Sequence, residues 1–67
     1  MPVMKFRVCR QRREARWVVT LGRAVYGAYL DRDQALLDAV DAARDAIQRG
    51  SEAQVWLWDH SVSSRIF

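Results

Sequence analysis

One amphipathic segment, residues 31–50, constrains the fold of this chain more than any other part of its sequence. Apolar residues recur there at the spacing of one helical face, namely Leu36, Val40, Ala43 and Ile47, flanked by Ala35, Ala39, Ala42 and Ala46. Asp31 and Gln34 form the pattern of a capping box, and Gly50 suits the position just beyond a helix. The sequence therefore predicts a helix here, and the rest of the fold must cover its apolar face.

Short segments with strand character surround this helix. Met4, Phe6 and Val8 alternate with polar residues, which is the periodicity of a strand with one buried face. By the same criteria we expect strands at residues 4–9, 17–21, 24–29, 54–59 and 63–67. Tight turns are expected at Gly22-Arg23 and at residues 60–62.

The order of these elements predicts a single α+β domain spanning residues 1–67. We expect one antiparallel sheet of β-β-β-α-β-β order, with the helix packed on one face. No segment then remains to cover the second face of the sheet.

Several classes of protein are disfavoured by what the sequence lacks. The chain of 67 residues has a single cysteine, Cys9, so no internal disulfide is available and a reducing compartment is expected. No apolar run reaches the length of a signal peptide or a membrane span, so we expect a soluble, cytoplasmic protein without membrane contact. Neither a phosphate-binding glycine motif nor the spacing of metal ligands is present, so we expect no cofactor and no metal.

Catalysis is not expected either. Asp59, His60 and Ser61 are the residue types of a hydrolytic triad, but adjacent side chains point in different directions and cannot form the relay. We therefore expect a binding protein rather than an enzyme.

Charge is divided unevenly along the chain. Residues 1–30 carry a net charge of +6, whereas residues 31–67 carry a net charge of −3. A basic region attracts polyanions, and an acidic helix repels them. The sequence therefore predicts a molecule with one basic and one acidic side.

The most basic stretch is CRQRREARW, Cys9 to Trp17, and it has three interpretations. It is a short arginine-rich helix, the solvated tip of a hairpin between two strands, or a phosphate-binding loop. In the third case guanidinium groups neutralise backbone phosphates and release counterions. The candidate contacts for nucleic acid are Arg7, Arg10, Arg12, Arg13, Arg16 and Arg23.

Trp56 and Trp58 are two residues apart in an expected strand, so their side chains point to one face, opposite Val55 and Leu57. If Val55 and Leu57 face the helix, the tryptophans lie on the open face near Val18. On that uncovered face they are available to a partner. The candidate partner interface is Trp56, Trp58, Tyr26 and Val18. Such a patch stacks nucleobases or forms a homodimer seam; the alternative is that the tryptophans are themselves the core.

The segment WVVTLGRAVYGAYLDRDQALLDAVDAARDAIQRGSEAQVWLWD, Trp17 to Asp59, resembles a group of short uncharacterised bacterial proteins. They share a tryptophan-led strand, a capped helix and a hydrophobic strand that ends near a basic hairpin. Their final turn usually contains a glycine, whereas this chain has His60-Ser61-Val62.

The strand-strand-strand-helix portion is also similar to the arm-type DNA-binding domain of tyrosine recombinases. That resemblance implies a sheet lying against a groove of DNA, with the six arginines named above touching phosphates.

Two functional hypotheses follow from the sequence. The first is binding of DNA or RNA through the arginine-rich N-terminal hairpin. The alternative is a homodimerising or protein-interacting accessory protein that uses the open sheet face or the alanine-rich flank of the helix.

Overall fold

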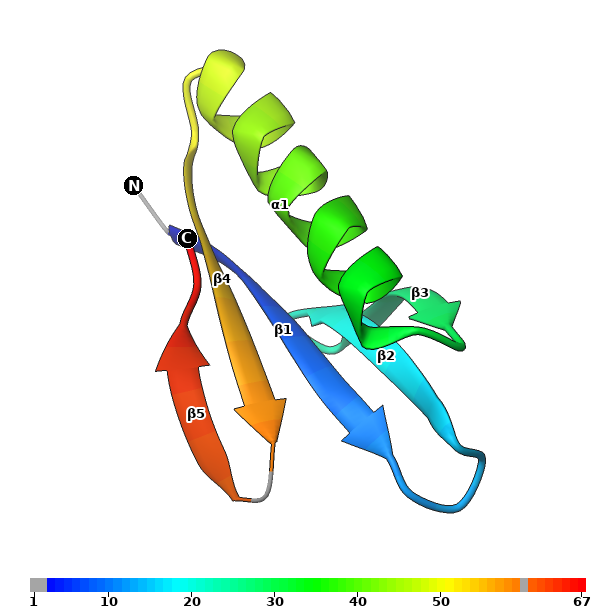
Figure 1. Ribbon diagram of the computed structural model, residues 1–67. Coiled ribbons are helices and arrows are strands. Elements are labelled where there is room, and N and C mark those ends of the chain that lie inside the picture. The colour runs from blue at the N-terminus through cyan, green and yellow to red at the C-terminus, as the bar shows by residue number, and fades with distance from the viewer. Residues whose placement is uncertain (1–2, 60) are drawn as a thin grey trace.

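A computed structural model describes residues 3–59 and 61–67 (Figure 1). Five strands and one helix follow each other in the expected order. They are β1 (Val3–Gln11), β2 (Arg16–Leu21), β3 (Ala24–Tyr29), α1 (Arg32–Gln48), β4 (Glu52–Asp59) and β5 (Val62–Arg65). The last strand begins at Val62 within the turn that the sequence predicted, and His60 of that turn lies outside the described residues.

The strands form one mixed sheet of order β3-β2-β1-β4-β5 with α1 across one face (Figure 1). The prediction of an α+β fold with one covering helix is confirmed. The prediction of an antiparallel sheet is wrong at one place, because β1 and β4 pair in parallel. After β3 the chain crosses the sheet through α1 and returns beside β1, and such a crossover delivers a parallel strand. Local sequence patterns do not specify this long-range choice of partner.

The core lies between α1 and the sheet face that it covers. Phe6, Val8, Val19 and Val55 on the sheet are at most 2% exposed. From the helix, Ala35, Ala39 and Ala43 are completely buried, whereas Ile47 is 45% exposed. The side of α1 that faces the sheet is therefore centred on the alanines and not, as predicted, on Leu36, Val40 and Ile47. The short side chains of the alanines let the helix approach the sheet closely. These alanines contact the sheet, so they are unavailable as a dimer surface.

Both helix ends are closed by local hydrogen bonds. At the start, the backbone N–H of Asp33 donates to the Asp31 carboxylate at 3.0 Å, but Gln34 donates to Asp38 instead of completing the predicted capping box. At the end, the N–H of Ser51 donates to the carbonyl of Ala46 at 3.0 Å. Gly50 makes this possible by adopting a φ of +93°, as in a Schellman motif.

The arginine-rich stretch is the tip of the β1–β2 hairpin. Gln11 pairs with Arg16, so residues 12–15 form a turn that projects from the sheet. The hairpin interpretation is confirmed and the helix interpretation is wrong. Ala15 closes the turn with a φ of +51°, a left-handed conformation that favours glycine.

Replacing Ala15 by glycine is expected to raise the free energy of unfolding by about 0.5–1 kcal/mol, because relief of the left-handed strain exceeds the added chain entropy. Urea unfolding measures the change. The matched control is Ala28→Gly in β3, where φ is not positive and where the substitution should lower stability by about 0.5–1 kcal/mol. Equal effects of the two substitutions would contradict the strained turn.

Enlarging a buried alanine tests the close approach of α1 to the sheet. Ala39→Leu is expected to lower the free energy of unfolding by about 1–3 kcal/mol, because the core has no room for the larger side chain. Asp41→Leu, on the exposed side of the same helix, should change stability by less than about 0.5 kcal/mol. If thermal and urea unfolding showed no change in the free energy of unfolding for Ala39→Leu, α1 would not pack closely against the sheet through its alanines.

Candidate functional site

The sheet face opposite α1 carries both C-terminal tryptophans. Val55 is fully buried and Leu57 packs against the core, so Trp56 and Trp58 point away from the helix. Trp58 is 40% exposed, and the interpretation of the tryptophans as core residues is therefore wrong. The indole N–H of Trp56 donates to the side-chain oxygen of Gln54 at 2.9 Å, which holds this ring on the face.

Basic side chains lie among these tryptophans. The Arg7 guanidinium is 5.8 Å from the centre of the Trp58 ring, within the range of a cation–π interaction. Arg65 of β5 pairs with Trp56. A hollow of about 190 Å³ opens between the strands and is lined by Lys5, Arg7, Trp56, Trp58 and Ser63. We call this surface, together with Arg65, the tryptophan face.

The two sides of the molecule carry opposite charge. Strand alternation places one acidic residue on the open face of the described strands, Glu52 at the start of β4, beside Lys5, Arg7, Arg16 and Arg65. α1 carries four aspartates and two arginines, so its net charge is −2. Asp33 and Asp45 of this set are paired with Arg32 and Arg49. The described residues of the open sheet face are therefore more positive than those of α1.

The structure separates the six arginines that the sequence singled out. Arg7 lies on the tryptophan face, Arg10 and Arg12 lie at the end of β1, and Arg13 is at the hairpin tip. Arg16 is engaged by the carboxylate of Glu14. Arg23 lies beyond the far end of β2, about 17–20 Å from the tip by the length of such a strand. They do not form one continuous patch.

Of the four candidate interface residues, Tyr26 lies on the wrong side of the sheet for that role. A bulge between Val19 and Thr20 shifts the register of β3, and the Tyr26 ring meets Phe6 edge-on at 5.6 Å on the helix side. Val18 is on the open face, where it pairs with Cys9, but it is only 6% exposed. The available aromatic surface is therefore that of Trp56 and Trp58.

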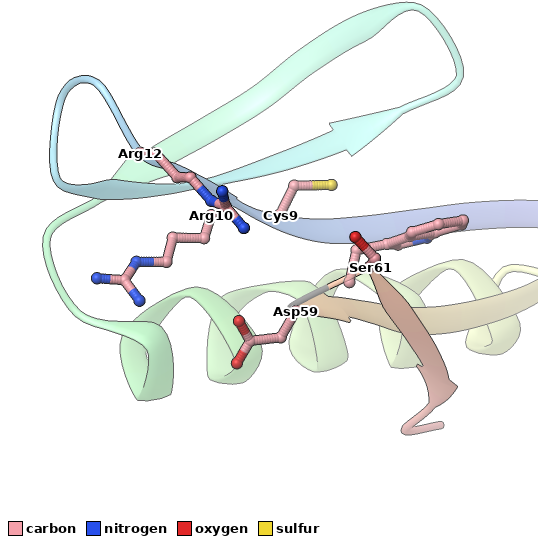
Figure 2. Close-up of a pocket in the computed structure, with 6 residues that line it drawn as sticks. Cys9, Arg10, Arg12, Asp59 and Ser61 are labelled. Carbon is pink, nitrogen blue, oxygen red and sulfur yellow. The ribbon is translucent and has the colours of Figure 1, made fainter.

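A second hollow opens where the parallel strands β1 and β4 end side by side (Figure 2). From here β1 turns toward β2 and β4 turns toward β5, on opposite sides. The hollow has a volume of about 190 Å³, and its described lining is Cys9, Arg10, Arg12, Trp58, Asp59 and Ser61. We call it the strand-end crevice. In Figure 2, Arg10 and Asp59 extend to the helix side, whereas Cys9 points to the other side.

The Cys9 side chain, which lines this crevice, is uncharged near neutral pH. Burial raises the pKa of its thiol, and the positive charge of Arg7 offsets part of that rise. The thiol is therefore protonated near neutral pH and is a poor nucleophile. Across residues 3–59 and 61–67, no three His, Cys, Asp or Glu side chains are grouped so that they would hold a metal ion.

Sequence reasoning missed several residues of these two hollows. Lys5 stood in the alternating pattern of the first strand, but its place in the same hollow as the tryptophans depends on the pairing of β1 with β4. Arg65 and Ser61 became recognisable only once the register of β5 was known. The signal present in the sequence was the alternation itself, which assigns Lys5 and Arg7 to one face.

No family model, curated protein or solved structure matches the chain. Within the described part of the chain, no helix combines the length and the apolar character needed to cross a membrane.

The protonation of Cys9 can be measured by alkylation. We expect the pH at which iodoacetamide reaches half its maximal rate to be higher for the folded protein than for the same protein in urea, because burial disfavours the thiolate. Arg7→Gln should raise that pH further by removing the stabilising positive charge. A lower half-maximal pH in the folded protein than in urea would contradict this account of the crevice.

Proposed function

We propose that this protein binds single-stranded nucleic acid on the tryptophan face, with bases on the indoles and phosphates on the neighbouring cations. The observation that carries the proposal is the contact of Arg7 with Trp58, in a hollow that Lys5 also lines, on a sheet face that the other described residues leave open. Its role is binding, not catalysis.

Stacking favours unpaired bases. Single-strand-binding proteins combine a positively charged groove with aromatic side chains on which successive bases stack. Trp56 and Trp58 stand about 6.6 Å apart along β4, given the rise of a strand, so each indole has room for its own base. In a duplex the faces of the bases are stacked on each other, and an exposed ring on a sheet cannot reach them.

The cations supply the phosphate contacts. Lys5, Arg7 and Arg65 are exposed beside the indoles, so they can reach the backbone on either side of a stacked base. Arg12 and Arg13 extend the same positive field at the hairpin tip. The hairpin thus contributes to attraction of the strand, while the tryptophan face holds it.

The alternative function is association with a second copy or another protein through the open face. A homodimer with two-fold symmetry would place this face against itself. The net positive charge of this face on one copy would then meet the same net charge on the other, and like charges across an interface are costly. This charge pattern favours a polyanion over self-association, and sedimentation of the free protein distinguishes the two.

The test is fluorescence anisotropy with a labelled 12-nucleotide thymidine strand, the corresponding uridine strand and a duplex, each at two salt concentrations. We expect the single strands to bind more tightly than the duplex. Trp58→Ala should weaken binding by about 1–3 kcal/mol, the usual worth of a stacked base. Leu37→Ala, a substitution of an exposed apolar residue on the helix side, should leave affinity unchanged.

The salt dependence tests the phosphate contacts separately. Arg7→Gln should reduce the slope of log affinity against log salt by about 0.7, the value for one phosphate contact on a single strand. Arg32→Gln makes the same charge change on the helix side and should leave the slope unaltered. Preference for the duplex, or a concentration-dependent dimer that shields Trp58 from fluorescence quenchers, would overturn the proposal.

A further inference from the structure

The strand-end crevice lies at a point where the topology of the sheet changes. Ligands of open parallel sheets bind outside the carboxyl ends of the strands, where two neighbouring strands lead to connections on opposite sides. β1 and β4 resemble this arrangement within a mixed sheet, because they are parallel neighbours whose hairpin connections lead away from each other to β2 and β5. The divergence of the two connections leaves the gap, and the other neighbouring strands that the structure describes are all antiparallel.

The chemistry of the crevice favours an anion. Arg10 and Arg12 contribute two guanidinium groups against the single carboxylate of Asp59, and Ser61 adds a hydroxyl donor. Guanidinium groups bind phosphate with paired hydrogen bonds, a geometry that a lysine does not offer. Cys9 contributes no opposing charge near neutral pH, because its thiol is protonated.

Trp58 is a wall of both hollows. It lines the hollow of the tryptophan face beside Lys5 and Arg7, and it lines the crevice beside Arg10 and Arg12. A base that stacks on Trp58 would therefore border both hollows, and a phosphate attached to its sugar would lie beside the crevice.

The size of the crevice limits what enters it. A volume of about 190 Å³ corresponds to roughly six water molecules at about 30 Å³ each. This is enough for a phosphate group with part of its sugar, and the rest of a bound strand would lie outside the crevice. The group that suits it is a terminal phosphate monoester, which carries a charge of about −1.5 to −2, more than an internal phosphate.

We propose that the strand-end crevice binds the terminal phosphate of a nucleic-acid strand whose last base lies against Trp58. This inference rests on the proposed function, and it assigns one end of the bound strand to the carboxyl ends of β1 and β4.

The experiment compares three eight-nucleotide thymidine strands: one with a 5′-phosphate, one with a 3′-phosphate and one with hydroxyl groups at both ends. Each phosphorylated strand carries its fluorophore at its other end, and the strand without phosphate is labelled at either end in turn as the matched control. Affinity is measured by anisotropy at fixed salt. We expect one phosphorylated strand to bind about 5- to 50-fold more tightly than the hydroxyl strand, as charge-assisted hydrogen bonds allow.

The Arg10→Gln/Arg12→Gln double variant should bind all three strands alike. Arg13→Gln removes a neighbouring charge at the hairpin tip that does not line the crevice, and it should keep the preference. Both variants alter exposed side chains, and circular dichroism verifies that each retains the fold.

The outcomes separate this inference from the proposed function. Equal affinity for all three strands, with binding still weakened by Trp58→Ala, would overturn the crevice assignment and leave the proposed function intact. A preference that survives in the double variant would place the phosphate elsewhere and overturn the assignment as well. If free thymidine monophosphate displaced the phosphorylated strand when both were at the same concentration, the crevice would be a mononucleotide site. The assignment to the end of a strand would then be wrong. If none of the strands binds, both proposals are wrong.

Discussion

The parallel pairing of β1 with β4 is the contact on which the rest of the molecule depends. It brings the N-terminal strand, rich in cations, beside the C-terminal strand that carries the tryptophans. It also places Phe6, Val8 and Val55 on one side, where the alanines of α1 cover them. Core and candidate site are thus the two faces of the same pair of strands. Alternation along each strand divides apolar residues from basic and aromatic ones.

Electrostatics gives the two sides of this layer different roles. The helix carries a net negative charge despite Arg32 and Arg44, whereas the open sheet face carries Lys5, Arg7 and Arg65. Under the proposed function, this uneven distribution of charge would orient an approaching nucleic-acid strand before contact. Because Trp58 contacts Arg7 and also borders Arg10 and Arg12, the aromatic surface lies where the positive groups converge.

Local patterns in the sequence predicted the elements but not their neighbours. The alternation in β1 and β4 and the cap at Asp31 correctly indicated strands, helix and buried faces, because these depend on residues close in the chain. Which strand lies beside β1 depends on the path of α1 across the sheet, so Lys5 and Arg65 were not associated with the tryptophans. Tyr26 was misplaced for a related reason, since one bulge exchanges the two sides of a strand. The strand-end crevice exists because β1 and β4 are parallel. The antiparallel sheet predicted from the sequence contained no such pair of strand ends, so the crevice was not expected.

The bulge in β3 also bears on how the molecule behaves at high concentration. β3 is an outer strand without a charged residue or proline, and Val25 is 67% exposed. A flat strand of this composition would be a template for joining sheets edge to edge. Interrupting its regular hydrogen-bond spacing increases the local twist, and a twisted edge offers few consecutive donors and acceptors to a neighbour. The irregularity that turns Tyr26 toward the helix therefore also protects the protein from aggregation along this border.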